Sequence, residues 1–392
     1  MYLPRALSNE FQQSLLSFPA LLITGPRQSG KTTFLHHTMG NAAAYVSFDD
    51  PMSRDFALSD PNGFLDQYQG DPVILDEIQY VPELLPYIKI RIDRNPEIYG
   101  KWLLTGSQQF RLMHQVSESL AGRIAIMELL PFSWIELPPR PIEDLIWQGG
   151  YPVPALHRDR LRLWMSSYIQ TYLERDVRQL INVHDLRQFE LFINLCAAGH
   201  GQTLHAATLA RETGVSQPTI KSWIGVLEAA YAVRLVPPWF RNYGKRLVKA
   251  PKLYFLDAAL ACALTRQPGG KAALSGAMGG ALFEGLIVSE AIKAFTHAGK
   301  KPEVYYWRTR DGMEVDLLIL IGGTILPVEI KLTATPSLNH VKPLTQLCRS
   351  LGDDIRPAGI LVCQCRKQTP MSGGHIAMPW QDFPGWLQKE IK

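Results

Sequence analysis

The most constraining feature of the sequence is a glycine-rich turn between two apolar runs near its start. In the segment PALLITGPRQSGKTTFL, which begins at Pro19, an apolar run precedes Gly25, Gly30, Lys31 and Thr32 in the spacing G-x-x-x-x-G-K-[ST]. This spacing, with a strand before it and a helix after it, is that of a P-loop. The sequence therefore predicts an α/β domain that begins with a nucleotide site.

Each residue type in this turn has a chemical reason. Glycines let successive backbone N–H groups curl around phosphate oxygens, Lys31 places a cation at the outer phosphates, and Thr32 offers a hydroxyl to Mg²⁺. We therefore expect ATP and Mg²⁺ as cofactors. The predicted nucleotide-binding residues are those of the turn and the helix start: Gly25, Pro26, Arg27, Gln28, Ser29, Gly30, Lys31, Thr32 and Thr33.

Two further apolar runs end in polar residues. The run PVILDEIQ ends in Asp76 and Glu77, and KWLLTGSQ contains Thr105 and Ser107. We expect Asp76 to join Thr32 at the metal and Glu77 to orient and activate the attacking water. Ser107, or alternatively Thr105, is placed to sense the γ-phosphate. The acidic pair favours hydrolysis of ATP over binding alone.

An arginine follows a segment of moderate helical periodicity. The sequence SLAGR presents Arg123. An arginine can stabilise transition-state charge at the site of a neighbouring subunit, so we predict this catalytic role for Arg123 and a homo-oligomer as the partner assembly. Arg91, Arg94 and Arg111 compete for the role, and a plain surface arginine is the alternative.

These segments together resemble a known family. GPRQSGKTT, YVSFDD, VILDEIQYVPELL, LLTGSQQF and SLAGRIAIMELLPFSWIE are similar to the AAA-type P-loop ATP-binding proteins of bacteria and archaea that carry a conserved C-terminal domain of unknown function. The resemblance continues through GGYP, YLERDV and KAPKLYFLD, so it covers most of the chain. It implies an AAA-type ATPase core, in which Arg123 falls at the family's LAGR motif.

The middle of the chain predicts a helix-turn-helix. TLHAATLARETGVSQPTIKSWIGVLEAA reads as two helices around a glycine turn, with Ser216 capping the second. A basic run without acidic residues follows: Arg234, Arg241, Lys245, Arg246, Lys249 and Lys252. Such a wing suits a phosphate backbone, so DNA is an expected partner, with a protein-interaction module as the alternative. The predicted DNA-binding residues are Gln217, Thr219, Lys221, Arg241, Lys245 and Arg246.

The C-terminal part combines carboxylates with a lysine. Glu284 lies in a predicted amphipathic helix and Asp316 on a strand after a turn, while LPVEIKLT places Glu329 and Lys331 on one face of another strand. These are the parts of a Mg²⁺-dependent phosphodiester hydrolase. Asp316, Glu329 and Glu284 are the predicted metal ligands. Lys331 is the predicted catalytic residue, which orients water or stabilises the anionic transition state.

This constellation resembles the PD-(D/E)xK restriction-endonuclease-like superfamily. The segment EVD, which contains Asp316, lacks the proline of the namesake pattern. The signature is short and permissive. A structural salt bridge on a half-buried strand is therefore the alternative interpretation.

Composition excludes several other classes. Apolar residues make up 46% of the chain and charged residues 19%, which is typical of a folded globular protein. No apolar run approaches the roughly 18 residues of a membrane span, and the first residues lack the pattern of a signal peptide. Five scattered cysteines, none in a C-x-x-C pair, fit neither a disulfide framework nor a zinc site. We therefore expect a cytoplasmic protein with no membrane partner.

The sequence predicts an AAA-type P-loop ATPase core over 1–130, a helical lid or linker over 131–190, a winged helix-turn-helix over 191–252, and a restriction-endonuclease-like α/β domain over 253–392. The predicted function is Mg²⁺-dependent ATP hydrolysis coupled to DNA binding and to metal-dependent DNA cleavage. Two alternatives stay open. One is a nucleotide-controlled DNA-binding or partner-binding regulator with a catalytically inactive nuclease-like domain, and the other is a small-molecule kinase that uses only the P-loop.

Overall fold

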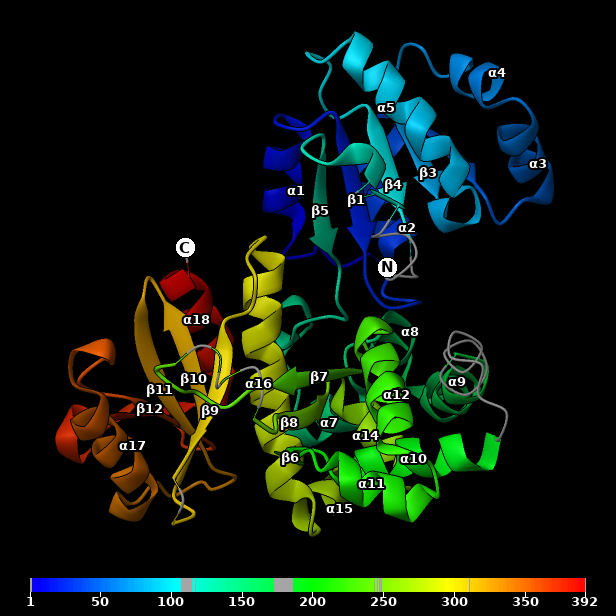
Figure 1. The fold of residues 1–392 in the computed structure, drawn as a ribbon. Helices are drawn as coiled ribbons and strands as arrows, with labels where there is room; N and C mark the ends of the chain where they lie inside the picture. Colours follow the sequence, from blue (N-terminus) through cyan, green and yellow to red (C-terminus); the bar gives the residue numbers. More distant parts are fainter. Residues whose placement is uncertain are drawn as a thin grey trace. The chain divides into compact units, whose positions relative to one another are not determined.

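The structure, a computed structural model, describes residues 2–106, 115–116, 118–172, 186–242, 244, 246, 249–309 and 311–391, without the side chain at 353. The chain divides into two compact units (Figure 1). One unit contains Met1–Phe132 and Thr296–Lys300, and the other contains Ser133–Phe295 and Lys301–Lys392.

A five-stranded parallel sheet forms the centre of the N-terminal unit. Its strand order is β2-β3-β4-β1-β5, and every pairing is parallel. Strand β4 therefore separates β1 from β3, and the carboxyl ends of these three strands meet at one edge. The strands are β1 (Ala20–Thr24), β2 (Ala44–Ser47), β3 (Val73–Asp76), β4 (Trp102–Thr105) and β5 (Ile124–Glu128).

Alternate residues of the central strands point into two separate cores, because successive side chains of a strand face opposite sides. Leu22, Leu75 and Leu104 pack with residues of one set of helices, and Leu21 and Leu103 pack with residues of the other. The first set is α3 (Pro51–Ser59), α4 (Pro61–Asp66) and α5 (Leu85–Arg94), and the second is α1 (Ser8–Leu15) and α2 (Lys31–Met39). Short 3₁₀ turns lie at Gly40–Ala42, Ile78–Tyr80 and Pro82–Leu84.

The C-terminal unit begins with helices that pack on helices from much later in the chain. Helix α7 contacts α14 and α15. The buried Asp257 carboxylate accepts a hydrogen bond from the Gly150 backbone at 2.8 Å. Of the predicted lid, 131–190, residues 133–172 and 186–190 thus belong to this unit. The elements are α7 (Ile142–Gln148), α8 (Pro152–Leu156), α9 (Leu161–Tyr168), α14 (Ala258–Leu264) and α15 (Gly270–Ser275).

The predicted pair of helices around a glycine turn is confirmed. Gly214 has φ 75°, a left-handed conformation that glycine adopts without strain. The Ser216 hydroxyl accepts a hydrogen bond from the Thr219 backbone N–H at 3.2 Å, which caps the second helix. The helices are α10 (Leu186–Ala198), α11 (Ala206–Thr213) and α12 (Gln217–Ala229).

A small antiparallel sheet of order β6-β8-β7 belongs to the same region. Its strands are β6 (Gln202–Thr203), β7 (Val233–Val236) and β8 (Lys252–Phe255). The predicted domain boundary at 252/253 therefore falls inside β8, and the sheet that follows the helix pair extends to Phe255.

A mixed six-stranded sheet of order β13-β14-β12-β11-β10-β9 completes the C-terminal unit. The predicted antiparallel pair around the turn at Gly312 is confirmed as β9 and β10, and β11 joins β10 antiparallel. Strands β11, β12 and β14 pair in parallel. The elements are α16 (Gly279–His297), β9 (Val304–Arg308), β10 (Glu314–Ile321), β11 (Thr324–Ile330), α17 (Leu338–Leu351), β12 (Ile360–Cys363), β13 (Thr369–Pro370), β14 (Ile376–Pro379) and α18 (Phe383–Ile391).

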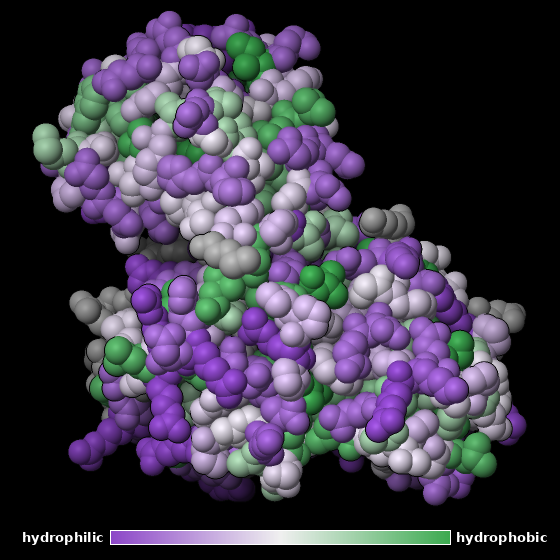
Figure 2. All heavy atoms as spheres, turned by 180° about the vertical axis from the view of Figure 1, so that it is seen from behind, coloured by the Kyte–Doolittle hydropathy of each residue, from purple (hydrophilic) through white to green (hydrophobic). Residues whose placement is uncertain are grey.

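Hydrophilic residues cover most of the face drawn in Figure 2, with hydrophobic residues scattered among them. The most exposed large apolar side chains, Leu16, Met52 and Leu163, lie on different elements. Single exposed apolar residues of this kind are normal on protein surfaces. Over the described ranges, no helix is both long enough and apolar enough to cross a membrane.

Candidate functional site

The predicted P-loop connects the end of β1 to the start of α2. Gly25 has φ 140°, and a Cβ atom there would lie 2.4 Å from the Leu129 carbonyl oxygen. Gly30 has φ 92° and directly precedes α2. The backbone therefore requires glycine at both positions. Gly25 is required by the close approach of Leu129, just after β5, and both glycines by their positive φ values. Gln28 also has a positive φ, 60°.

Lys31 is folded back onto its own loop. Its ammonium group donates hydrogen bonds to the carbonyl oxygens of Gly25 at 3.2 Å and Pro26 at 2.9 Å. The residue is buried, and this burial lowers the pKa of Lys31 to about 8, against the pull of the Glu77 and Asp76 carboxylates. Two neutral carbonyls are weak partners for a buried cation. Anionic phosphate oxygens in the loop are stronger acceptors for the same group.

The Asp76 carboxylate accepts hydrogen bonds from three hydroxyl groups near the carboxyl ends of the strands. Thr32 Oγ1 donates to the two carboxylate oxygens at 2.9 and 3.1 Å. Thr105 Oγ1 donates at 2.5 Å and the Tyr45 hydroxyl at 3.0 Å. Asp76 is buried, so these bonds compensate the loss of water around its charge. The structure brings together the two residues that the sequence assigns to Mg²⁺, Thr32 and Asp76.

Glu77 stands next to this cluster in a strained backbone conformation. Its φ and ψ are 58° and 46°, the left-handed region that residues other than glycine rarely adopt. The backbone N–H donates to Thr105 Oγ1 at 3.0 Å, and the Gln79 amide donates to the Glu77 carboxylate. Thr105 therefore links Asp76 to Glu77. Strain of this kind concentrates at functional sites. Ser107, the predicted phosphate sensor, lies outside the described residues.

Arg123 lies at the opposite edge of the sheet. It precedes β5, whose residue Ile124 pairs with Ala20 at the start of β1, whereas the P-loop follows Thr24 at the end of β1. At about 3.3 Å per strand residue, the separation is about 16 Å. The Arg123 side chain forms an ion pair with Asp93 at 2.5 Å. Arg123 therefore does not approach the P-loop of its own chain.

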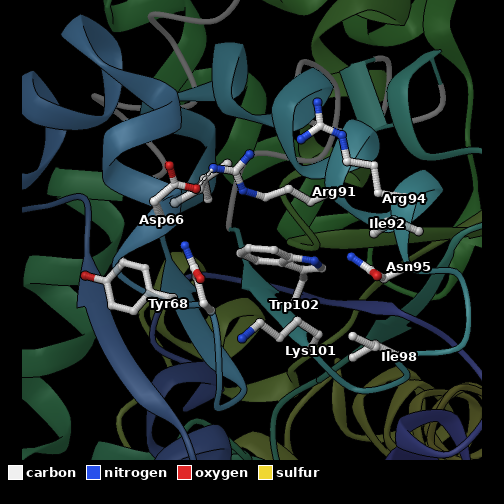
Figure 3. Close-up of a pocket in the computed structure, with 11 residues that line it drawn as sticks. Asp66, Tyr68, Arg91, Ile92, Arg94, Asn95, Ile98, Lys101 and Trp102 are labelled. Atoms are coloured by element: carbon white, nitrogen blue, oxygen red, sulfur yellow. Dashed lines mark hydrogen bonds and ion pairs between the residues drawn. The ribbon is translucent and has the colours of Figure 1, made fainter.

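Two of the competing arginines, Arg91 and Arg94, lie at the same far edge. A pocket at the amino end of β4 has a volume of about 260 Å³. Arg91, Arg94, Lys101 and Trp102 are among the residues that line it (Figure 3). Arg91 pairs with Asp66 at 2.5 Å. These two arginines are therefore also remote from the P-loop of their own chain, and Arg111 falls outside the described residues.

Sequence reasoning missed three residues that support the nucleotide site. The buried Arg5 donates to the Ser29 carbonyl in the P-loop at 3.1 Å and to the Leu130 carbonyl at 2.6 Å. Tyr45 bonds Asp76, and Gln79 bonds Glu77. Gln79 stands within the PVILDEIQ segment that drew attention to Asp76. Arg5 carries no local pattern, so only the fold reveals its contact with the loop.

The C-terminal carboxylates and lysine also come together. The Lys331 ammonium lies 2.9 Å from Asp316 Oδ2 and 2.8 Å from Glu329 Oε1. The same Asp316 oxygen accepts the Ile330 backbone N–H at 2.8 Å, which ties β10 to β11. Both carboxylates are buried, and Glu329 Oε2 has no hydrogen-bond partner within the described part of the chain. Glu329 and Lys331 share a face, as predicted.

Glu284 projects from α16 toward the same region but has other contacts. Its Oε1 lies 2.8 Å from the Lys252 ammonium and accepts the Tyr254 hydroxyl at 2.5 Å. Lys252 also pairs with Glu314. Burial, reinforced by the nearby Asp316 charge, raises the pKa values of Glu284 and Glu329. Over the described residues, no three His, Cys, Asp or Glu side chains form a group that can hold a metal ion in this arrangement.

The predicted DNA-binding residues divide into two groups. Gln217 and Lys221 are exposed at the start of α12, and Thr219 is half-buried with its hydroxyl on Ser216. Arg241 pairs with Asp354 at 3.1 Å, and Arg246 packs its guanidinium 3.3 Å from the centre of the Trp239 ring. Lys245 lies outside the described residues.

One residue of the basic run departs from the prediction. Lys252 was expected on a solvated wing, but it is buried between carboxylates. Burial of a cation requires compensating negative charge, and that charge comes from residues that follow Lys252 by more than thirty positions in the sequence. This part of the predicted basic wing is therefore wrong.

Comparison with protein families divides the chain into three segments. Residues 17–137 match a family described as an AAA domain, which contains the P-loop, Asp76 and Glu77. Residues 140–270 match a domain of unknown function, DUF8612, and residues 279–383 match another, DUF4143. Glu284, Asp316, Glu329 and Lys331 all fall within the DUF4143 match. The first of these matches shows an AAA-type P-loop ATPase domain, which binds ATP.

Two relatives that match most of the chain come from mycobacteria. The uncharacterised proteins Mb2031c of Mycobacterium bovis and Rv2008c of Mycobacterium tuberculosis are each 32% identical over 339 residues, which cover 86% of this chain and 75% of theirs. Among solved structures, the Walker-type ATPase PabY2304 of Pyrococcus abyssi aligns with a TM-score of 0.45 at 16% identity, over 66% of this chain and 94% of that one. The chain belongs to the family of the two mycobacterial proteins, and it combines an AAA-type P-loop ATPase domain with a C-terminal DUF4143 domain.

Proposed function

We propose that the protein is a Mg²⁺-dependent ATPase of the AAA type whose hydrolysis of ATP is coupled to DNA binding. The observation that carries the proposal is the Asp76 cluster. In it, the carboxylate expected at Mg²⁺ bonds the P-loop hydroxyl of Thr32, and Thr105 links it to the backbone of Glu77. A binding-only site has no need for an acidic residue held in strain beside this cluster.

The residues of the site have distinct roles in this proposal. Thr32 and Asp76 are the residues that would hold Mg²⁺, which would neutralise charge on the outer phosphates. Lys31 leaves the carbonyls of Gly25 and Pro26 for phosphate oxygens. Glu77 orients the attacking water and accepts its proton.

Two further residues complete the proposed catalytic machinery. Ser107 senses the γ-phosphate. Arg123 acts on the site of a neighbouring subunit, so the active form is a homo-oligomer.

The proposed DNA contact is made by a winged helix-turn-helix formed by α11, α12 and the small sheet. Helix α12 presents Gln217 and Lys221 to solvent at its N-terminal end. The first residues of such a helix contact base edges and phosphates when it enters the major groove. The capped, exposed start of α12 supports this interpretation.

The proposal is tested by ATP hydrolysis with and without duplex DNA. We expect DNA to stimulate hydrolysis by the wild type and Lys31→Ala to reduce hydrolysis in both conditions. In Lys221→Glu, basal hydrolysis stays at the wild-type rate. DNA affinity falls by about tenfold at low salt, because one phosphate contact worth about 1 kcal/mol becomes a repulsion.

A matched control is Lys271→Glu, which reverses an exposed lysine on α15 in the same unit. We expect this variant to bind DNA and respond to it like the wild type. A Lys31→Ala protein that hydrolyses ATP at the wild-type rate would contradict the ATPase proposal. Equal loss of DNA binding in both charge-reversal variants would reject a specific contact at α12.

A second candidate function is metal-dependent DNA cleavage by a restriction-endonuclease-like C-terminal domain. The observation that favours it is the triangle of Asp316, Glu329 and Lys331, together with the buried Glu329 oxygen that lacks a partner. An unpaired buried carboxylate oxygen fits a cation ligand. Asp316 and Glu329, with Glu284 from α16, are the residues that would hold Mg²⁺ there, and the metal would activate water for phosphodiester attack.

Cleavage is measured as nicking or linearisation of supercoiled plasmid in the presence of Mg²⁺ or Mn²⁺. We expect nicking by the wild type and its loss, by at least about 100-fold, in Lys331→Ala, because the ammonium holds both carboxylates and is the group proposed to stabilise the anionic transition state. Lys367→Ala, which removes an exposed lysine of the same domain, keeps the activity. ATP hydrolysis without any nicking by the wild type would favour the regulator with an inactive nuclease-like domain.

A further inference from the structure

The carboxylate site already contains a cation that belongs to the chain. Lys252 is the first residue of β8 and is buried. Its ammonium lies 2.8 Å from Glu284 Oε1 and also contacts the Glu314 carboxylate. Burial lowers the pKa of Lys252, but the negative charges of Glu284, Glu314 and Asp316 outweigh this effect and raise it above the usual value of a lysine. This lysine comes from the small β6-β8-β7 sheet, whereas its partners come from α16 and β10.

Two lysines divide the carboxylates between them. Lys252 pairs with Glu284 and Glu314, and Lys331 pairs with Asp316 and Glu329. Arg308 also lies 3.7 Å from Glu314, so four carboxylates face three cationic side chains, and Glu329 Oε2 has no hydrogen-bond partner among the described residues. A divalent cation that takes Glu284 as a ligand competes with the Lys252 ammonium for the same carboxylate. An ammonium and a metal ion do not share one carboxylate oxygen at bonding distance without strong repulsion.

We propose that the Lys252 ammonium is the resident cation of this site. A divalent metal ion is bound by Asp316, Glu329 and Glu284 together only when Lys252 leaves Glu284. The inference rests on the proposed metal-dependent function and deepens it by naming its regulation. In this structure the Lys252 ammonium binds the Glu284 carboxylate, so Glu284 does not join Asp316 and Glu329 in one metal-binding group. In addition to burial, the Asp316 charge lies close enough to raise the pKa values of Glu284 and Glu329.

The position of Lys252 connects the site to the proposed DNA-binding region. Strand β8 pairs with β7, and the Leu235 backbone of β7 donates to the Glu228 carboxylate of α12 at 3.2 Å. On the other side, the Tyr306 hydroxyl of β9 donates to the Ala250 carbonyl at 2.8 Å, two residues before Lys252. These contacts connect α12 to β8, and in our proposal they are the route by which a displacement of α12 reaches Lys252. DNA bound at α12 is the event we expect to withdraw Lys252 from Glu284.

The test compares Mn²⁺ binding by the wild type and by Lys252→Met, which keeps an unbranched apolar stem one atom shorter than that of lysine and removes the charge. Free Mn²⁺ is measured by electron paramagnetic resonance in the absence of ATP and DNA. We expect Lys252→Met to bind Mn²⁺ at least tenfold more tightly than the wild type. We also expect its Tm to fall below that of the wild type in EDTA and to recover with Mn²⁺, because the ion replaces the lost ammonium.

Lys293 provides a matched control. It is a buried lysine that pairs with the buried Glu290 at 2.9 Å, away from the site, so Lys293→Met removes an equivalent charge. We expect Lys293→Met to lose stability without recovery in Mn²⁺. Recovery of both variants by Mn²⁺, or Mn²⁺ binding by Lys252→Met that is no tighter than that of the wild type, would overturn the inference.

The outcomes also separate this inference from the proposed metal site. If the wild type binds Mn²⁺ tightly, Asp316→Asn abolishes that binding and Lys252→Met does not improve it, then the metal site stands and the role of Lys252 is rejected. If neither the wild type nor Lys252→Met binds Mn²⁺, both proposals fall. Binding by Lys252→Met that persists in Lys252→Met/Asp316→Asn places the ion elsewhere and also overturns the inference.

A measurement on the unmodified chain remains decisive even if Lys252→Met does not fold. Amine-reactive labelling of the wild type, read by mass spectrometry, reports how often each lysine leaves its buried partners. We expect labelling of Lys252 to rise several-fold with saturating Mn²⁺ and duplex DNA, while labelling of Lys293 stays constant. Unchanged labelling of Lys252 under conditions where Mn²⁺ is bound would show that the ion enters without displacing it.

Discussion

A Glu77→Gln protein is expected to bind ATP like the wild type and to hydrolyse it about 10² to 10⁴ times more slowly. The amide keeps the size of the carboxylate but does not accept a proton from water. The backbone of residue 77 stays in place, because its N–H bonds Thr105 and not the side chain that changes. Single-turnover hydrolysis, measured beside equilibrium binding of a fluorescent ATP analogue, separates the chemical step from affinity.

The control for this prediction is Glu83→Gln, which removes an exposed carboxylate from the next turn of the same segment. Its hydrolysis rate is expected to equal that of the wild type. A Glu77→Gln protein that keeps more than a third of the wild-type rate would exclude Glu77 as the residue that activates water. A loss confined to ATP binding would instead assign Glu77 to the ground-state site.

The sequence was informative about the nucleotide site because its residues occupy fixed points of a repeating architecture. Each apolar run predicts a buried strand, and the polar residue after it lies at the carboxyl end. Asp76 and Thr105 were predictable in this way and Thr32 from the P-loop spacing, and the structure brings the three within hydrogen-bond distance. Tyr45 was not, because its contact depends on β2 pairing with β3, and strand order is not written in any local pattern.

The carboxylate site shows the same limit more sharply. The two-residue period of a strand predicted that Glu329 and Lys331 share a face, and the antiparallel turn brought Asp316 beside them. Lys252 stands in a run of basic residues without an acidic neighbour, a pattern that is typical of a solvated surface. Only the fold places it against Glu284 and Glu314, because the sheet that contains β8 packs its lysine toward α16 and β10.

Segment boundaries were the least predictable feature of the fold. Prolines between residues 138 and 154 indicated breaks between helices, but they carry no information about what the helices pack against. Helix α7 contacts α14 and α15, although more than a hundred residues of sequence separate it from both. Contacts over such a separation are expected within a compact domain of ordinary size. The proposed lid role of 131–190 thus remains a prediction about motion of this segment.

An Arg123→Ala protein is expected to hydrolyse ATP about 10³ to 10⁵ times more slowly than the wild type, the range that an arginine finger contributes. The geometry makes this a prediction about two subunits. Arg123 lies about 16 Å along the sheet from the P-loop of its own chain, so it reaches a phosphate only from a neighbour. In the isolated chain its charge is held by Asp93. The effect is measured by comparing the rates of ATP hydrolysis of Arg123→Ala and of the wild type over a range of protein concentrations.

Mixing two inactive proteins distinguishes action in trans from a structural role. Lys31→Ala retains Arg123 but not the P-loop cation, and Arg123→Ala retains the P-loop, so a mixed assembly contains interfaces at which an intact arginine faces an intact site. We expect hydrolysis to return on mixing in proportion to the fraction of such interfaces. Asp93→Asn serves as the control, because it frees Arg123 from its ion pair and preserves the rate. Failure of the mixture to recover, with both proteins folded and assembled, would remove Arg123 from the catalytic machinery, because its own P-loop lies out of reach.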